Sequence, residues 1–232
     1  MNIREAEKNV GGLSAPSKMP TYGWSISAFN CGVGSILVIK EGSACFECYA
    51  RKGRYIFPNV QNALKRRLQK WHEDRALWRA SMIYLMNNKK GIVTSGCFRW
   101  FDSGDLQGIT MLSDIVTVAR QSPRVKHWLP TKEYQLVKSS KFAMHPSNLI
   151  IRVSHPKVGK VFNALDVACG NAPRHNSAIF DAGKFVDGFD RIDQGIDGGL
   201  KVFCPSSLQG NSCGDCRACW NSRIETVVYK AH

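Results

Sequence analysis

The sequence predicts an α/β protein: a partial, incomplete TIM-like barrel of parallel strands with outer helices, plus a C-terminal cysteine-rich extension. Strand-like apolar runs alternate with helical patterns, which is typical of parallel βαβ units. Polar residues or cysteines follow each run, at the strand ends where parallel α/β folds carry their sites. We therefore expect an N-terminal lead-in at 1–21, the partial barrel at 22–203 and a cysteine-rich segment at 204–232.

Each element is predicted from its local pattern. The first twenty residues are polar with glycine and proline, which indicates an extended lead-in. The clearest helix is 59–88, where apolar residues recur at three- and four-residue steps, and Trp71 and Trp78 on its apolar stripe are expected in the core. A second amphipathic helix is expected at 113–122. Strands are expected at 22–29, 97–106, 125–132, 148–155 and 200–205, and residues 156–200 are expected to form loops with short elements.

Charge and composition narrow the class of protein. The 232 residues carry 32 Lys and Arg against 18 Asp and Glu, a formal charge of +14. Such a balance favours a polyanionic partner, nucleic acid above a membrane surface, although a basic protein without such a partner is the alternative. No apolar run is long enough for a transmembrane helix, and "MNIREAEKNVGG" has no secretory signal, so we expect a cytoplasmic protein. In a reducing compartment, clustered cysteines indicate metal ligands more than disulfides.

The first cysteine set consists of Cys31, Cys45 and Cys48, with thirteen residues between the first two. Three thiolates leave one iron of a [4Fe–4S] cluster without a protein ligand, and an open metal position can bind a substrate or cofactor. The alternative is a zinc site that takes a fourth ligand, such as Cys97 or His72. The spacing by itself does not decide between the two.

The residues around this set carry a family resemblance. The stretch "CFECYA" after the first strand resembles the radical S-adenosylmethionine superfamily, in which three cysteines hold a [4Fe–4S] cluster and an aromatic residue lies beside the last of them. Strand ends "SGDL" (103–106), "PTK" (130–132) and "RVSH" (152–155) follow in order. Together with "CYA" they look most like a phage-encoded branch of that superfamily, which would place the protein in the host cytoplasm. The spacing of the three cysteines differs from the usual one, and the superfamily's Gly-Gly-Glu turn is only approximated.

The resemblance implies a chemistry and a set of site residues. A reduced cluster would cleave S-adenosylmethionine to a 5′-deoxyadenosyl radical that abstracts hydrogen from a substrate, with electrons from an external donor. The turn Ser103-Gly104-Asp105 would meet the methionine amino group, Lys132 would pair with a carboxylate, and Ser154 would bond the ribose. Without the resemblance, Ser103 and Asp105 are interpreted as a helix cap or turn and Lys132 as a surface lysine. Ser154 is then a turn residue at a strand end.

The second cysteine set indicates a closed metal site. Its CxxCxxC spacing resembles the bacterial ferredoxin run, and four thiolates ligate a cluster fully, so a second, auxiliary [4Fe–4S] cluster is favoured over zinc. Cys97 and Cys169 belong to neither set and are expected to be free thiols. The members of the second set are Cys204, Cys213, Cys216 and Cys219.

Three functions are compatible with these features. The first is a radical S-adenosylmethionine-type enzyme with two clusters that acts on nucleic acid or a nucleotide. The second is a non-catalytic iron–sulfur or zinc protein that binds nucleic acid, and the third is an electron-transfer protein. The basic helix around 59–79 fits either of the first two, because phosphate contacts position a nucleic acid without specifying its sequence. The substrate is not encoded in any motif.

Overall fold

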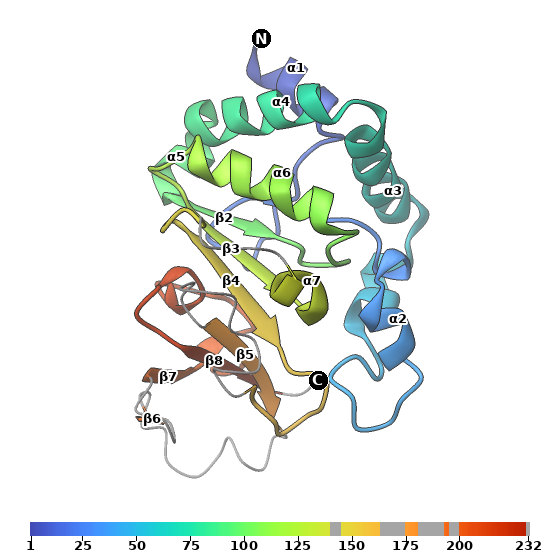
Figure 1. The fold of residues 1–232 in the computed structure, drawn as a ribbon, viewed down its shortest axis with the longest axis vertical. Coiled ribbons are helices and arrows are strands. Elements are labelled where there is room, and N and C mark those ends of the chain that lie inside the picture. The colour runs from blue at the N-terminus through green and yellow to red at the C-terminus, as the bar shows by residue number, and fades with distance from the viewer. Residues whose placement is uncertain (140–144, 163–174, 181–192, 195–199, 231–232) are drawn as a thin grey trace.

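A computed structural model describes residues 1–139, 145–162, 175–180, 193–194 and 200–230. Its strands are β1 (Gly23–Trp24), β2 (Cys97–Trp100), β3 (Lys126–Thr131), β4 (Leu149–Ser154), β5 (His175–Phe180), β6 (Asp193–Gln194), β7 (Leu200–Phe203) and β8 (Thr226–Lys230). They form one sheet in the order β1-β2-β3-β4-β5-β8-β7-β6 (Figure 1). Only the β6–β7 pair is antiparallel, so seven strands run parallel. The predicted α/β class with a parallel sheet is confirmed, and in the described residues the sheet is open, with β1 and β6 at its edges.

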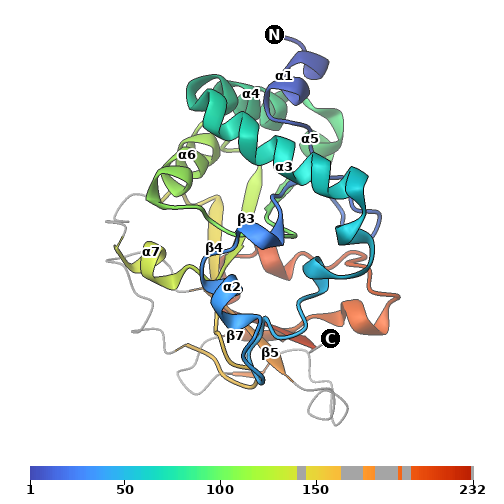
Figure 2. The ribbon, with the colours of Figure 1, turned by 90° about the vertical axis from the view of Figure 1, so that its right-hand side faces the viewer.

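The helices gather mainly at one end of the molecule. They are α1 (Ile3–Asn9), α2 (Val33–Leu37), α3 (Pro58–Glu73), α4 (Arg75–Asn88), α5 (Lys90–Ser95), α6 (Ile109–Arg120) and α7 (Tyr134–Ser139). Figures 1 and 2 show α1, α3, α4, α5 and α6 together, whereas α2 and α7 lie on the side toward which the arrows of β3 and β4 point. Among the described helices, none is long and apolar enough to cross a membrane.

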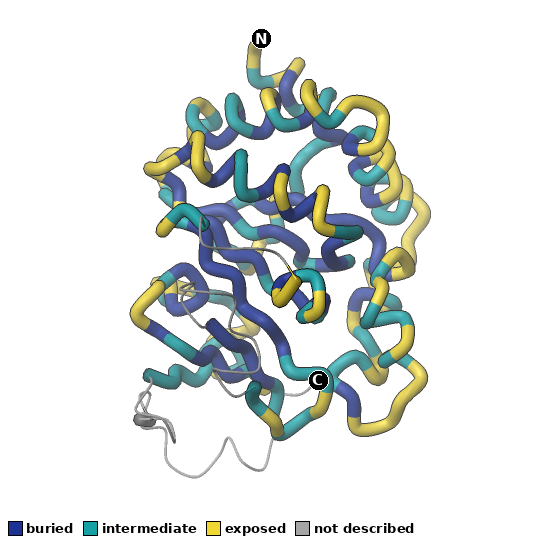
Figure 3. Tube along the Cα trace, in the orientation of Figure 1, coloured by how far each residue is buried: buried dark blue, intermediate teal, exposed yellow. Residues whose placement is uncertain are grey.

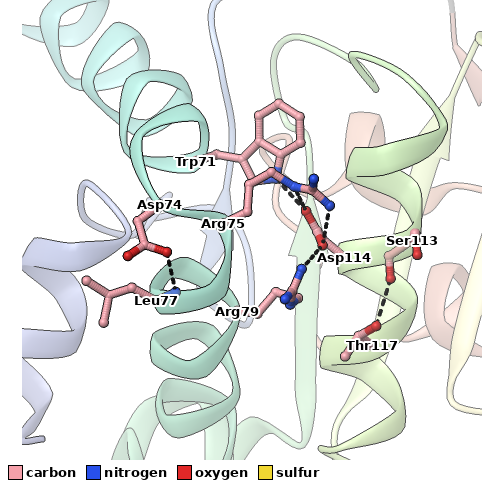
Figure 4. Close-up of polar contacts among 8 residues, drawn as sticks. All are labelled: Trp71, Asp74, Arg75, Leu77, Arg79, Ser113, Asp114 and Thr117. Atoms are coloured by element: carbon pink, nitrogen blue, oxygen red, sulfur yellow. Dashed lines mark hydrogen bonds and ion pairs between the residues drawn. The ribbon is translucent and has the colours of Figure 1, made fainter.

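The stretch predicted as one helix at 59–88 is two helices. Asp74 separates α3 from α4 with an extended backbone, φ −152° and ψ 95°. Its carboxylate accepts a hydrogen bond from the backbone N–H of Leu77 at 2.9 Å and caps the start of α4 (Figure 4). Aspartate favours such caps over helix interiors because its side chain competes for backbone N–H groups. The apolar stripe continues across the break, so periodicity alone could not reveal it.

Buried tryptophans form the centre of the core between the helices and β1 to β4. Trp24, Trp78 and Trp100 are fully buried, and the rings of Trp24 and Trp78 meet edge to face with centroids 5.2 Å apart. Trp71 is also buried, which confirms the prediction that both tryptophans of the 59–88 stretch belong to the core. Figure 3 shows the central strands buried along most of their length. Side chains of this size dominate core energetics, so this cluster holds the helical layer on the sheet.

A buried carboxylate joins three helices. Asp114 on α6 accepts hydrogen bonds from Trp71 Nε1 at 2.9 Å, Arg75 Nε at 2.9 Å and Arg79 Nη1 at 2.6 Å (Figure 4). Burial would raise the pKa of Asp114, but the bonds from Arg75, Arg79 and Trp71 outweigh it and lower the pKa. Arg75 interrupts the apolar periodicity of the 59–88 stretch, and its ion pair with Asp114 explains this polar position.

Both ends of the chain differ from the expected organisation. The lead-in is not simply extended, because α1 forms with a capping box between Asn2 and Glu5, and Ala6 and Val10 enter the core. At the other end, β8 lies between β5 and β7 in the sheet. The cysteine-rich segment expected at 204–232 therefore also supplies an interior strand of the sheet.

Candidate functional site

The first cysteine set lies on the loop that surrounds α2. Cys31 immediately precedes this helix, and Cys45 and Cys48 follow it; all three side chains are half-buried. A Cβ atom added at Gly34 would lie 3.4 Å from Cys31 Sγ and 3.7 Å from Cys45 Sγ. The same Cβ atom would lie 3.0 Å from Cys31 Cβ, so the cysteine side chains approach Gly34 too closely for a larger residue to fit without a shift.

The three thiols act on one another electrostatically. Burial, and next the charges of Asp105, Cys45 and Cys48, together raise the pKa of Cys31 to about 12. Burial also raises the pKa of Cys45, against the opposing charge of Lys132. Thiols with raised pKa values stay protonated at neutral pH unless a metal centre compensates the negative charge of the thiolates.

The end of β2 meets the end of β3 at Asp105. This carboxylate is buried and accepts hydrogen bonds from Thr131 Oγ1 at 2.6 Å and from the backbone N–H groups of Lys132 and Leu106, both at 2.8 Å. Burial nevertheless raises the pKa of Asp105 to about 6. The predicted strand 97–106 ends earlier, at Trp100, so Asp105 lies in the turn after β2, where it ties this turn to the end of β3 beside the first cysteine set.

The end of β4 meets that of β3 through Lys132. Lys132 Nζ lies 3.3 Å from Ser154 Oγ, in a hydrogen bond that the lysine donates. The charge of this lysine also opposes the burial-raised pKa of Cys45. The carboxyl ends of β2, β3 and β4 therefore converge on the first cysteine set, as expected for parallel strands.

Two of the predicted site residues have a structural task. Ser103 Oγ donates a hydrogen bond to the carbonyl of Ile26 at 2.7 Å. Gly104 has φ +74°, and a Cβ atom there would lie 2.7 Å from the same carbonyl oxygen. Both residues fasten the end of β2 to the chain after β1, and glycine is required at the second position.

Glu133 and Asp102 hold the first cysteine loop and were not identified from the sequence. Glu133 Oε1 accepts the backbone N–H of Val33 at 2.7 Å and so fixes the start of α2 next to Cys31. The Asp102 backbone carbonyl accepts a hydrogen bond from the hydroxyl of Tyr49, the aromatic residue after Cys48. Neither residue belongs to a motif with a recognisable spacing, because each contact joins segments far apart in the chain.

The second cysteine set gathers on the other face of the sheet from the helices. Cys204 follows β7, and the other three cysteines lie in the turns between it and β8. Burial raises the pKa of Cys213, and the charges of Cys204 and Cys216 add to this rise. Burial also raises the pKa of Cys219 to about 12, with a contribution from the charge of Cys204. All four thiols therefore share one electrostatic environment. Cys219 Sγ also lies 3.1 Å from the hydroxyl of Tyr229 on β8.

A buried arginine holds the backbone around Cys219. Arg152 on β4 is fully buried and donates to the carbonyls of Cys219 and Ala218, both at 3.0 Å. It also donates to the carbonyls of Asn176, Asn221, Ile224 and Glu225. Among the described ion pairs none involves Arg152, so its partners are neutral carbonyls with the Cys219 thiol and Tyr229 nearby.

A second arginine lies between the two cysteine sets. Arg99 on β2 stacks over the ring of Trp128 at 4.5 Å. Its charge acts on Tyr49, which follows Cys48, and opposes the burial-raised pKa of Cys219 in the second set. One guanidinium therefore acts on the second set and on a neighbour of the first.

Cys97 and His72, the candidate fourth ligands of a zinc site in the first set, make their contacts elsewhere. Cys97 packs with Cys219 in the smaller apolar cluster, so it belongs beside the second set and not the first. His72 stacks edge to face on Trp71 at 4.7 Å within α3. Cys169 lies outside the described residues. In the described part of the chain, no group of three or more His, Cys, Asp or Glu side chains has the arrangement of a metal site.

The fold and these two sets define a class: an α/β protein with an open parallel sheet, one cysteine set at the strand ends and another packed against the sheet. The family described as gene product 88 matches residues 27–222 of the chain. That span contains all seven cysteines of the two sets, and the chain belongs to this family. No curated protein and no solved structure matches the chain.

Proposed function

We propose that the chain is an iron–sulfur protein of the radical S-adenosylmethionine type, carrying one [4Fe–4S] cluster on the first cysteine set and an auxiliary one on the second. The supporting observation is the convergence of Cys31, Cys45 and Cys48 with the ends of three parallel strands. Three thiols on one loop would ligate three of the four irons of a cubane and leave one iron free. When bound, that cluster supplies the electron that cleaves a carbon–sulfur bond of S-adenosylmethionine.

The chain's own residues would bind and orient that cofactor. Lys132 places an ammonium group beside Cys45, where it can pair with a carboxylate. Ser154 Oγ, within reach of Lys132 Nζ, can donate to a hydroxyl of the same ligand. Asp105 is largely ionised at pH 7 despite its raised pKa of about 6 and can accept from an amino group. Ser103 and Gly104 fasten this end of the sheet to the chain after β1.

The second set suits a fully ligated centre. Four thiols and two arginines share one partly buried environment, and the Arg152 charge has no described carboxylate partner. Four ionised thiolates around a metal centre would compensate that buried charge, whereas four protonated thiols would not. The same logic fits zinc, so metal analysis decides between the two.

A non-catalytic function is the second candidate. Both Asp105 oxygens already accept hydrogen bonds from the β3 end, and Ser103 is engaged with Ile26. These contacts favour a scaffold that keeps its clusters for binding nucleic acid or for transferring electrons. A phage origin, as the resemblance implies, is compatible with either function.

The test begins with protein purified without oxygen. Two [4Fe–4S] clusters correspond to about eight irons and eight sulfides per chain. Cys48→Ala and Cys216→Ala should each lose about half of the iron, and Cys97→Ala, outside both sets, should lose none. After reduction with dithionite, 5′-deoxyadenosine should form from S-adenosylmethionine in the wild type and not in Cys48→Ala. Intact clusters with no cofactor binding would establish the non-catalytic alternative, and zinc in place of iron would remove both cluster assignments and leave a non-catalytic zinc protein.

A further inference from the structure

Exposed aromatic side chains concentrate around the first cysteine set. Within the described residues, the aromatic side chains exposed on the surface are Phe29, Phe46, Tyr49 and Phe57, each between 43% and 55% exposed. All of them lie in the segment that carries α2 and the three cysteines; much of this segment is exposed in Figure 3. A group of exposed apolar side chains of this kind marks an interaction site. We call these residues the aromatic rim.

Two of the rim side chains are held in place by the protein. The guanidinium of Arg51 stacks on the Phe29 ring at 5.0 Å, and it is fixed in turn by hydrogen bonds to Ala28 O at 3.2 Å and Ser35 Oγ at 2.8 Å. Tyr49 is fixed through its hydroxyl on the Asp102 carbonyl, with its ring against Tyr55 at 5.7 Å. Rings held this way lose little conformational freedom when a ligand stacks on them.

Positive charges are interleaved with the rim. Lys40, Lys52 and Arg54 are exposed within the same segment, and α3, which starts directly after Phe57, exposes Lys65 and Arg66. The chain as a whole carries +14. Aromatic faces beside lysine and arginine are the two components with which proteins bind single strands: rings stack on bases, and cations meet phosphates.

We infer that the aromatic rim binds single-stranded nucleic acid and presents it to the first cysteine set. This inference deepens the proposed function by naming its substrate class, and it rests on that function for the identity of the reacting centre. A duplex fits less well, because its bases are already stacked and cannot lie on the rings.

Binding of labelled oligonucleotides tests the inference. Fluorescence anisotropy with a mixed-sequence 20-nucleotide DNA, the same RNA and the matching duplex is measured at about 50 mM salt and above. Phe46→Ala and Phe57→Ala should each weaken single-strand binding roughly tenfold, and Phe57→Tyr should preserve it. Val93→Ala and Leu208→Ala remove exposed apolar side chains elsewhere and should have no effect. Thermal unfolding checks that each variant is folded.

The outcomes separate this inference from the proposed function. Three results would overturn the rim assignment, whatever the iron content. They are no binding at low salt, equal affinity for the duplex, and equal losses of binding in the rim and control variants. Capture of anionic lipid vesicles in place of oligonucleotides would overturn it as well. Conversely, rim-dependent binding by a chain without iron would support the rim and refute the proposed function.

Discussion

Replacing Arg152 by methionine tests whether a single buried side chain holds the second cysteine set. Methionine fills a similar length but removes the guanidinium, which donates to the carbonyls of six residues and is fully buried. Each buried carbonyl left without a partner costs about 1–3 kcal/mol. Methionine avoids the desolvation of a buried charge, and the turns between Ala218 and Glu225 can relax toward water, so part of this cost is recovered.

We therefore expect the free energy of unfolding to fall by about 3–5 kcal/mol, a large part of the roughly 5–15 kcal/mol of a whole domain. For a chain of this size, that corresponds to a Tm lower by about 10 °C. Circular dichroism on heating measures it, and metal content measures whether Cys219 stays in position. Arg223→Met removes an exposed arginine from the same segment and is the control. A loss below about 1 kcal/mol in Arg152→Met would show that the carbonyls find other partners, and would refute this reasoning.

Three further predictions follow from the first cysteine set and the helical layer. Gly34→Val should push its side chain against Cys31 and Cys45, displace their sulfurs and remove about half of the iron, whereas Ile36→Ala on the exposed face of α2 should keep it. Full iron retention in the valine variant would mean that these two sulfurs hold no cluster. Burial raises the pKa of Asp105 from 3.8 to about 6, so the folded state binds this proton more tightly than the unfolded state. The wild type should therefore lose stability relative to Asp105→Asn as the pH rises from about 4 to 6. Denaturant titrations at these pH values measure the difference in stability, and a difference that stays constant with pH would contradict the prediction. Asp114→Asn should lower the free energy of unfolding by about 1–3 kcal/mol, because Trp71 loses an ionised hydrogen-bond acceptor. Arg75 and Arg79 are partly exposed and can be hydrated instead, which limits the loss. Unchanged denaturant unfolding would show that the contacts of Asp114 contribute nothing to stability.

The sequence predicted the framework of the sheet well where hydrophobic runs are long. β2, β3, β4 and β7 lie within the predicted strands, because continuous apolar runs bounded by polar turns are typical of buried parallel strands. β5 and β8 were not predicted. β5 begins His175-Asn176-Ser177, a polar run that becomes a strand only because β4 and β8 supply backbone partners on either side.

The candidate site was predicted in its positions but not in its contacts. Asp105, Lys132 and Ser154 lie near the first cysteine set, as strand-end logic indicated. Glu133, by contrast, contacts Val33 a hundred residues away, and no local pattern encodes such a pair. The metals, the cofactor and the nucleic acid remain predictions that the experiments above test.

By itself, the sequence determined two cysteine sets of different character, a parallel α/β framework and a strongly basic chain, because spacing, periodicity and charge are local or summed properties. Only the tertiary structure decided what surrounds each set. Asp74 breaks one apolar stripe into two helices, and β8 enters the sheet between β5 and β7, which brings Cys219 onto Arg152. These arrangements depend on where distant backbone groups find hydrogen-bond partners, and such pairings are settled only when the whole chain packs.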